Sequence, residues 1–330
     1  MQQSDARPSR FAALTGPLST LLSNQAVSLF FILLLLWLVL GAMSPVFFTV
    51  NNILQITLQG AVVALVAAGM TFVILSGGID LSVGSIFAFS AMVTGIAMQS
   101  EFGLFGSIAA GLLAGTAVGF LNGFGVARLG LPAFIVTLGM MSIARGGALL
   151  LNNGTPIFGL VDGFNIIGQG RIADVIPVPT IIVLVVYLIC WFVLRYTPFG
   201  RFTYAIGSNP EAARLAGVRV SLQVIGIYML SGLLTAVAAM VEASRLNSTQ
   251  PAGGDGLELN AIGAVVIGGT SLFGGEGSIF ASLIGALIIA TIRNGLTILG
   301  ISAFWQNVAT GAIIILAVYL DRLRRNRQGS

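Results

Sequence analysis

Ten long apolar segments, separated by short polar stretches, constrain the fold of this chain more than any other feature. They lie at about residues 26–43, 53–75, 84–99, 104–127, 132–151, 177–195, 222–245, 258–273, 278–298 and 304–320. A helix needs about 20 apolar residues to cross a bilayer. Only 8% of the 330 residues are charged, whereas a soluble domain carries about a quarter. The pattern predicts an all-α polytopic integral membrane protein with about ten transmembrane helices, in contact with membrane lipid.

The distribution of arginine predicts the topology, because cytoplasmic loops carry an excess of basic residues. With ten spans, the loop and tail arginines sort to one side, with Arg171 alone on the other; the first group is Arg7, Arg10, Arg128, Arg195, Arg201, Arg214, Arg219, Arg322, Arg324, Arg325 and Arg327. Both termini are therefore expected in the cytoplasm, as tails 1–25 and 322–330 around a single transmembrane domain at 26–321. The loop 196–221 faces the cytoplasm and the turn-rich loop 152–176 faces outward, with room for a short helix or a pair of strands. Since most of the positive charges lie in loops and tails, they do not indicate nucleic acid.

Missing residue types exclude several kinds of site. The chain has no histidine and no lysine, and all fifteen basic residues are arginine. A phosphate-binding loop that ends in Gly-Lys, a Schiff-base lysine and a Ser-His-Asp triad are therefore impossible. The lone cysteine, Cys190, lies within an apolar segment and excludes an internal disulfide. We expect no catalytic residue, no metal site and no cofactor, and an integral-membrane enzyme is a poor alternative.

One polar loop between two apolar segments contains a short helix with complete start and stop signals. Asn209 or Ser208 suits the N-cap, Pro210 the first helical position, Glu211 the positive end of the helix and Gly217 the stop. A helix of about two turns is not stable alone in water. It is therefore the best candidate for a contact with a soluble partner.

Two further patterns concern helix packing. Small residues recur every fourth position at Gly103, Ser107, Gly111, Gly115, Gly119 and Gly123, which predicts a glycine face along one helix. The face serves packing within one bundle, a dimer seam or a wall of a transport path. In addition, Gly84-Ser-Ile-Phe-Ala88 recurs as Gly277-Ser-Ile-Phe-Ala281 after a second glycine-rich turn, either by duplication or by chance.

Few ionisable residues lie at membrane depth, where they mark candidate functional sites. They are Arg145, Glu242, Arg245 and Arg293, with Asp80 and Glu276 at inner turns. Arg145 and Arg293 are long enough to extend toward the outer surface, Glu242 and Arg245 are spaced to pair on one helix, and Asp80 suits a helix cap or a gate. An ion-coupled transporter usually needs acidic groups deep in the membrane. Glu242 is the only acidic residue among those at membrane depth, so the sequence argues against coupling through buried carboxylates.

Several segments together resemble the permease subunit of bacterial ABC importers of the ribose/monosaccharide type. The most specific are Gly69-Met-Thr-Phe-Val-Ile-Leu-Ser-Gly-Gly-Ile-Asp-Leu-Ser-Val-Gly84, Ala133-Phe-Ile-Val-Thr-Leu138, Gly200-Arg201 with Ala205-Ile-Gly207, Asn209 and Glu211-Ala-Ala213, Ala243-Ser-Arg-Leu246 with Gln250-Pro251, and Ala264-Val-Val-Ile-Gly-Gly-Thr-Ser271. The resemblance implies a multi-pass protein of the bacterial inner membrane that moves a monosaccharide from periplasm to cytoplasm. It implies three partners: an ATP-binding subunit with two fused nucleotide sites, a periplasmic sugar-binding protein, and a second permease copy or paralogue. Hydrolysis of ATP is expected in the separate subunit.

The resemblance also implies roles for particular residues. The coupling helix at 209–217 would contact the ATPase through Asn209, Glu211, Ala212, Ala213, Arg214 and Gly217. Sugar passage needs hydroxyl-matching groups and aromatic walls, for which the candidates are Asn122, Phe134, Thr137, Asn294 and Gln306. Candidates for docking of the binding protein are Arg171, Asp162 and Arg245. Alternatives are a cargo of another class, such as a branched-chain amino acid, a nucleoside or a signalling sugar derivative, and, less favoured, an ion-coupled secondary transporter.

Overall fold

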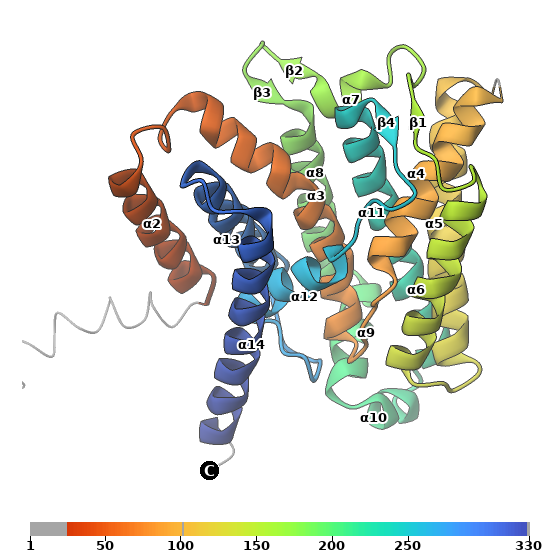
Figure 1. Cartoon of the computed structure of the whole chain (residues 1–330). Coiled ribbons are helices and arrows are strands. Elements are labelled where there is room, and N and C mark those ends of the chain that lie inside the picture. Colours follow the sequence, from red (N-terminus) through yellow and green to blue (C-terminus); the bar gives the residue numbers. More distant parts are fainter. Residues whose placement is uncertain (1–24, 101, 329–330) are drawn as a thin grey trace, which may run out of the picture.

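Each of the ten predicted apolar segments contains a helix of the computed structural model, which describes residues 25–100 and 102–328 (Figure 1). The helices are α2 (Gln25–Met43), α3 (Val50–Leu75), α4 (Val83–Gln99), α5 (Gly103–Ala127), α6 (Ala133–Leu150), α8 (Val178–Tyr196), α11 (Val220–Leu246), α12 (Leu257–Ile267), α13 (Ile279–Ile298) and α14 (Ala303–Gln328). The tail arginines Arg7 and Arg10 lie outside the described residues. Arg322 to Arg327, in the expected tail 322–330, are helical and continue α14 to Gln328.

Seven helices in the described part of the chain are long and apolar enough to cross a membrane. The apolar stretches of α4, α12 and α14 are shorter, at Val83–Gln99, Leu257–Ile267 and Phe304–Leu316. The segment at 258–273 is the largest deviation, because α12 ends at Ile267 and a glycine-rich turn follows. The fold is thus a helical multi-pass bundle.

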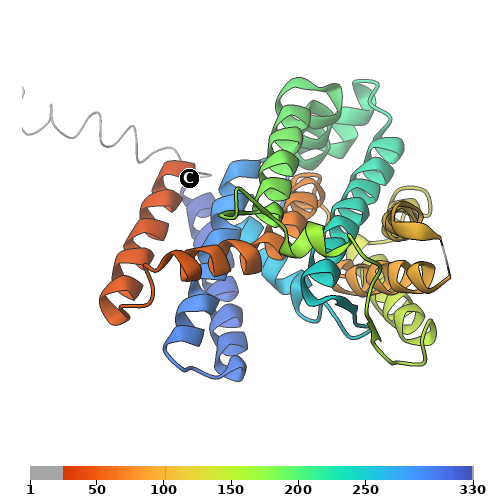
Figure 2. The same ribbon diagram turned by 90° about the horizontal axis from the view of Figure 1, so that it is seen from above.

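The centre of the bundle is formed by α3 and α11, which pack against each other and against most of the remaining helices. Viewed from above, α3 runs from beside α2, across α13, toward α11 (Figure 2). The C-terminal half of α3 is buried on all sides from Leu65 to Leu75. Outer helices instead expose large apolar side chains, such as Phe105 (85%) and Leu150 (80%), which are suited to lipid.

The glycine face of α5 packs inside the bundle, against α11 and α4. A Cβ built on Gly119 would lie 2.3 Å from the carbonyl oxygen of Tyr228, and one on Gly115 would lie 2.7 Å from that of Gly232. A Cβ built on Gly232 of α11 would likewise lie 2.2 Å from the carbonyl oxygen of Gly115. The two backbones therefore touch, which only glycine permits. The face from Ser107 to Gly123 is buried within this chain, which favours the first of its three predicted roles.

The two copies of the Gly-Ser-Ile-Phe-Ala motif both stand at the start of a helix but differ in conformation. Gly84 lies within the first turn of α4, whereas Gly277 precedes α13 with φ of 156°. The identical residues of the two motifs therefore occupy different positions relative to the start of the helix.

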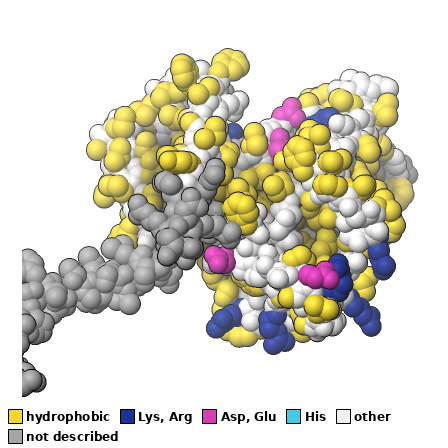
Figure 3. All heavy atoms as spheres, turned by 90° about the horizontal axis from the view of Figure 1, so that it is seen from below, with side chains coloured by type: hydrophobic (Ala, Val, Ile, Leu, Met, Phe, Trp, Pro, Cys, Tyr) yellow, Lys and Arg dark blue, Asp and Glu magenta, His cyan; other side chains and the backbone are white. Residues whose placement is uncertain are grey.

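Opposite ends of the bundle carry different kinds of loop (Figure 1). At one end, the segment 152–177 forms the short helix α7 (Asn165–Gln169) and three of four two-residue strands: β1 (Ile157–Phe158), which pairs with β4 (Ser248–Thr249), and β2 (Arg171–Ile172), which pairs with β3 (Ile176–Pro177). Both options left open for this loop, a helix and strands, are present. At the other end lie α10 (Pro210–Leu215), the start of α2 and the end of α14. Seen from below, arginine side chains stand out there among largely uncharged ones (Figure 3).

Candidate functional site

A cavity of about 410 Å³ lies between α3, α4, α11, α12 and α13. Its wall includes the last turns of α11, so it lies toward the end of that helix that is farther from α10. The lining combines apolar groups and one aromatic ring, Phe87, with polar side chains; these are Gln59, Glu242, Arg245, Ser248, Thr249, Gln250, Asp255, Asn260 and Arg293. A mostly apolar pocket with a few placed polar groups is the usual form of a small-molecule site.

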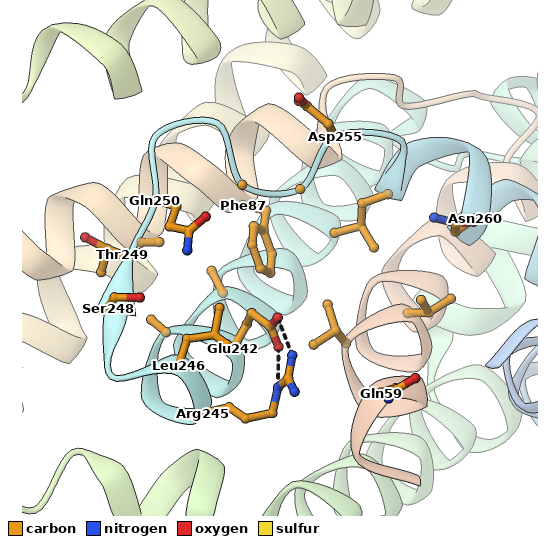
Figure 4. Close-up of a pocket in the computed structure, with 18 of the residues that line it drawn as sticks. Gln59, Phe87, Glu242, Arg245, Leu246, Ser248, Thr249, Gln250, Asp255 and Asn260 are labelled. Carbon is orange, nitrogen blue, oxygen red and sulfur yellow. Dashed lines mark hydrogen bonds and ion pairs between the residues drawn. The ribbon is translucent and has the colours of Figure 1, made fainter. Parts of the chain in front are cut away.

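Glu242 and Arg245 form a two-pronged ion pair on the wall of this cavity (Figure 4). Arg245 donates from Nε to Glu242 Oε2 at 2.8 Å and from a terminal nitrogen to Oε1 at 2.7 Å. The predicted pairing of these residues, three apart on one helix, is confirmed. Two parallel hydrogen bonds hold both side chains in one plane, so this part of the wall is geometrically fixed.

The residues 250–256, here called the rim loop, close one side of the cavity. Arg145 donates to the carbonyl oxygens of Pro251 and Gly253 at 2.9 and 2.7 Å and to the carboxylate of Asp255 at 2.6 Å. Gly254, with φ of 77°, brings the loop backbone against Gly84 at the start of α4. Arg145 therefore ties α6 to the rim loop.

Two of the predicted path residues meet in a separate buried cluster around the turn before α4. Asp80 accepts hydrogen bonds from the Ser82 backbone N–H at 2.9 Å and from the Ser82 hydroxyl at 2.6 Å. Asn122 donates to the Ser82 hydroxyl at 2.8 Å, and Thr137 donates to the Ile79 carbonyl at 3.3 Å. Asp80 thus binds the turn just ahead of α4, close to its predicted capping role.

The other three predicted path residues lie apart from this cluster and from the cavity lining. Asn294 donates to Asn52 at 2.8 Å and so joins α13 to α3. Phe134 is 55% exposed on α6, and Gln306 donates to Thr297 and to the Ile301 carbonyl. The structure therefore does not bring the five residues to one surface.

The candidates for docking of a binding protein are found at the end of the bundle opposite α10. Arg171, in β2, and Asp162 are exposed. Arg245 is partly buried in its ion pair and lines the cavity instead. The loop around Asp162 is anchored, because Ser244 of α11 donates to the Phe164 carbonyl at 2.5 Å and accepts from the Gly168 N–H at 2.7 Å.

At the opposite end, α10 has the predicted capped geometry. Asn209 Oδ1 accepts from the N–H groups of Glu211 and Ala212 at 3.0 and 2.9 Å, and Arg214 pairs with Glu211 at 2.5 Å. Ala213 is buried, and Gly217 ends the segment with φ of 86°. Leu215, not singled out from the sequence, is 84% exposed.

A second helix in this loop, α9 (Pro198–Ser208), was not predicted. It begins with a Thr197 cap and Pro198, the same start signals as α10. The Tyr204 hydroxyl donates to the Gly277 carbonyl at 3.0 Å, and burial raises its pKa, so it stays protonated. A Cβ on Gly207 would lie only 1.8 Å from the Leu75 carbonyl oxygen. The loop is therefore packed tightly onto the end of α3 and the turn before α13.

Sequence reasoning missed most of the cavity lining. Glu242 and Arg293 were noted as ionisable groups but were not assigned to a common site. The segments Ala243–Leu246 and Gln250–Pro251, which carry part of the family resemblance, both contribute to the wall. The presence of both segments close together in the sequence was the signal that could have indicated this site.

Comparison with known proteins assigns the chain to a family. The family described as branched-chain amino acid transport system / permease component matches residues 52–318. The ribose import permease protein of Escherichia coli K12 is 43% identical over 297 residues, 89% of this chain and 92% of its own. The ribose import permease of Bacillus subtilis 168 is 44% identical over 90% of this chain and 93% of its own. A fructose import permease of Rhizobium meliloti is 41% identical over 83% and 78%. No solved structure matches the chain.

Proposed function

We propose a function for this chain from the premise that it belongs to the family of branched-chain amino acid transport system permease components. It is the permease subunit of an ABC importer for a monosaccharide, in the inner membrane. One observation carries this assignment: relatives more than 40% identical over most of the chain are import permeases for ribose, D-allose and fructose. The chain is a transport subunit and not an enzyme.

The finer topology is part of the proposal. Ten spans, with both termini in the cytoplasm, are supported by ten helices at the predicted segments and by the position of α10, the start of α2 and the end of α14 toward one side (Figure 1). We assign that side to the cytoplasm because it carries the loop arginines. The short helices α4 and α12 would then span only with the help of the extended turns beside them.

We propose that α10 couples the permease to an ATP-binding subunit with two fused nucleotide sites. A helix of six residues that projects from the bundle, stabilised by its own cap and ion pair, is suited to a groove on a partner. Leu215 offers it an exposed apolar side chain beside Ala212 and Ala216. Buried Ala213 fixes the helix to its own chain.

The helix α11 provides a mechanical connection between the two ends. It starts four residues after Ala216 and runs uninterrupted for 27 residues, about 40 Å, to the ion pair on the cavity wall. Its first turn is tied to α9, because Gln223 donates to the Phe199 carbonyl at 2.7 Å and to Thr203 at 3.1 Å. A displacement of α9 and α10 would tilt α11 and so alter the cavity.

The remaining partners follow from the class of importer. A periplasmic sugar-binding protein would dock near Arg171 and Asp162, at the end of the bundle where the cavity lies. A second permease copy or a paralogue would complete the pathway. We propose that the cargo passes through the cavity described above. The five path residues first predicted do not line that cavity.

ATP-driven uptake in proteoliposomes tests this function. The chain, its ATPase subunit and its binding protein should import labelled ribose or a related monosaccharide. Uptake should require ATP inside the vesicles, with the binding protein outside them. Glu211→Arg should abolish uptake without loss of folded protein, because it places two like charges beside each other at Arg214. Accumulation by the chain alone, driven by an ion gradient, would establish a secondary transporter instead. Uptake of leucine but of no sugar would assign another cargo.

A further inference from the structure

Two glutamine side chains of the cavity lining are accessible and unoccupied. Gln59 of α3 and Gln250 of the rim loop both line the cavity, and both are exposed. Within the part of the chain that the structure describes, neither amide group forms a hydrogen bond. Figure 4 shows the Gln250 amide directed from the rim loop into the cavity, toward the side of Glu242 and Leu246. Each amide therefore offers donors and an acceptor to a molecule in the cavity.

The ion pair of Glu242 with Arg245 also has hydrogen-bonding capacity left. Arginine has five N–H donors, and two of those of Arg245 bind Glu242, so three remain. Each carboxylate oxygen of Glu242 accepts one of these bonds and has a further lone pair. The two side chains are 24% and 30% exposed, with Glu242 the lower. The outer edge of the pair thus presents donors and acceptors side by side, in a plane that the pairing fixes.

The charges on the cavity lining cancel. Two acidic and two basic residues line it, namely Glu242, Asp255, Arg245 and Arg293, so their formal charges sum to zero. Glu242 and Arg245 are bound to each other, and Asp255 is bound to Arg145. A charged cargo would have to break such a pair to gain an opposite charge, whereas an uncharged cargo can bind the free edges. The lining is therefore suited to a neutral molecule.

We propose that these four accessible side chains, here called the polar wall, recognise the hydroxyl groups of a neutral polyhydroxyl cargo; they are Gln59, Glu242, Arg245 and Gln250. The inference rests on the proposed function and names the contacts that determine its specificity. A hydroxyl group both donates and accepts, so neighbouring hydroxyls of one sugar bind an amide and the edge of the ion pair together. The carbon skeleton of the sugar is left to the apolar lining, where Leu246 is 45% exposed.

The test uses the complete importer in proteoliposomes, at sugar concentrations that saturate the binding protein, so that differences arise in the permease. Uptake of ribose is compared with uptake of its single-deoxy analogues for wild type, Gln59→Leu, Gln250→Leu and Glu242→Gln. Gln55→Leu is the matched control, because Gln55 lies one turn earlier on α3, is exposed and does not line the cavity. ATP hydrolysis stimulated by the binding protein is measured in parallel.

Gln59→Leu and Gln250→Leu should each slow ribose uptake roughly two- to tenfold, the effect of one lost hydrogen bond. Each should also lose the preference for ribose over one deoxy analogue, because the hydroxyl that it recognised no longer matters. Glu242→Gln leaves Arg245 without its counter-charge and should slow ribose uptake by roughly tenfold or more. Gln55→Leu should transport and discriminate like wild type.

Wild-type uptake and discrimination in both glutamine variants would overturn the inference. An equal slowing of ribose and of every deoxy analogue would also overturn it, in favour of a structural role. The two glutamine variants keep the test decisive if Glu242→Gln fails to fold, since their amides hold no contact within the described residues. A wild-type importer that moves no monosaccharide would instead refute the proposed function, and uptake of leucine in its place would exclude the polyhydroxyl assignment.

Discussion

The close contact between α5 and α11 predicts that one methyl group added to α5 at Gly119 will destabilise the protein. In Gly119→Ala, the new Cβ would lie 2.3 Å from the Tyr228 carbonyl oxygen and 3.1 Å from the Met229 Cα. Both neighbours are backbone atoms of α11, so no side chain can rotate out of the way. Ordinary contact begins at 3.4 Å, and the two helices would have to separate by roughly 1 Å. Overpacking of this kind costs about 1–3 kcal/mol.

Gly106→Ala is the matched control on the same helix. Its Cβ would meet only the Phe102 side chain, with the nearest atom at 3.5 Å. Alanine has the higher helix propensity at both positions, so a loss of stability found only in Gly119→Ala isolates the contact of Gly119 with α11. For a chain of this size, about 1 kcal/mol corresponds to roughly 2–4 °C in Tm.

The assay is thermal unfolding of the detergent-purified proteins, followed by circular dichroism. Gly119→Ala should lower Tm by roughly 2–12 °C, whereas Gly106→Ala should leave it unchanged or raise it. Gly115→Leu should fail to assemble, since its Cβ already meets the Gly232 carbonyl oxygen at 2.7 Å. Equal Tm values for Gly119→Ala and Gly106→Ala would refute the close packing of the two backbones.

Three further predictions concern the two ends of the molecule and the turn between α3 and α4. Leu215→Asp should weaken binding of the ATPase subunit about tenfold, measured by co-purification, because burial of a leucine contributes about 1.5–3 kcal/mol; wild-type binding would exclude Leu215 from the contact. Asp80→Ala should destabilise the protein by about 1–3 kcal/mol, because the Ser82 donors lose their acceptor, and an unchanged Tm would contradict this. Arg145→Met should increase protease cleavage in the rim loop, and equal cleavage rates would show that other contacts hold it.

Short-range patterns predicted much of the fold. The ten apolar segments became helices because burial of backbone polar groups in lipid requires internal hydrogen bonds. Asn209, Pro210 and Gly217 predicted α10 because capping depends only on neighbouring residues. The i, i+3 spacing likewise predicted the ion pair of Glu242 with Arg245.

The cavity could not be predicted in the same way. Its wall joins Gln59 of α3, Arg245 of α11, Asn260 of α12 and Arg293 of α13, which lie far apart in sequence. Asn122 and Thr137 were expected on a path, and both contact the turn at 77–84, because polar side chains at membrane depth bind polar groups of neighbouring helices and turns. Nothing in the sequence around them distinguishes the two roles.

The sequence by itself determined the approximate positions of the ten apolar helices, where the capped helix begins, and to which family the residues point, since each depends on neighbours along the chain. Only the tertiary structure decided that the glycine face of α5 closes against α11 and that residues of α3, α11, α12 and α13 line one cavity. Both depend on how separate helices approach one another, and that approach is set by the packing of the whole bundle.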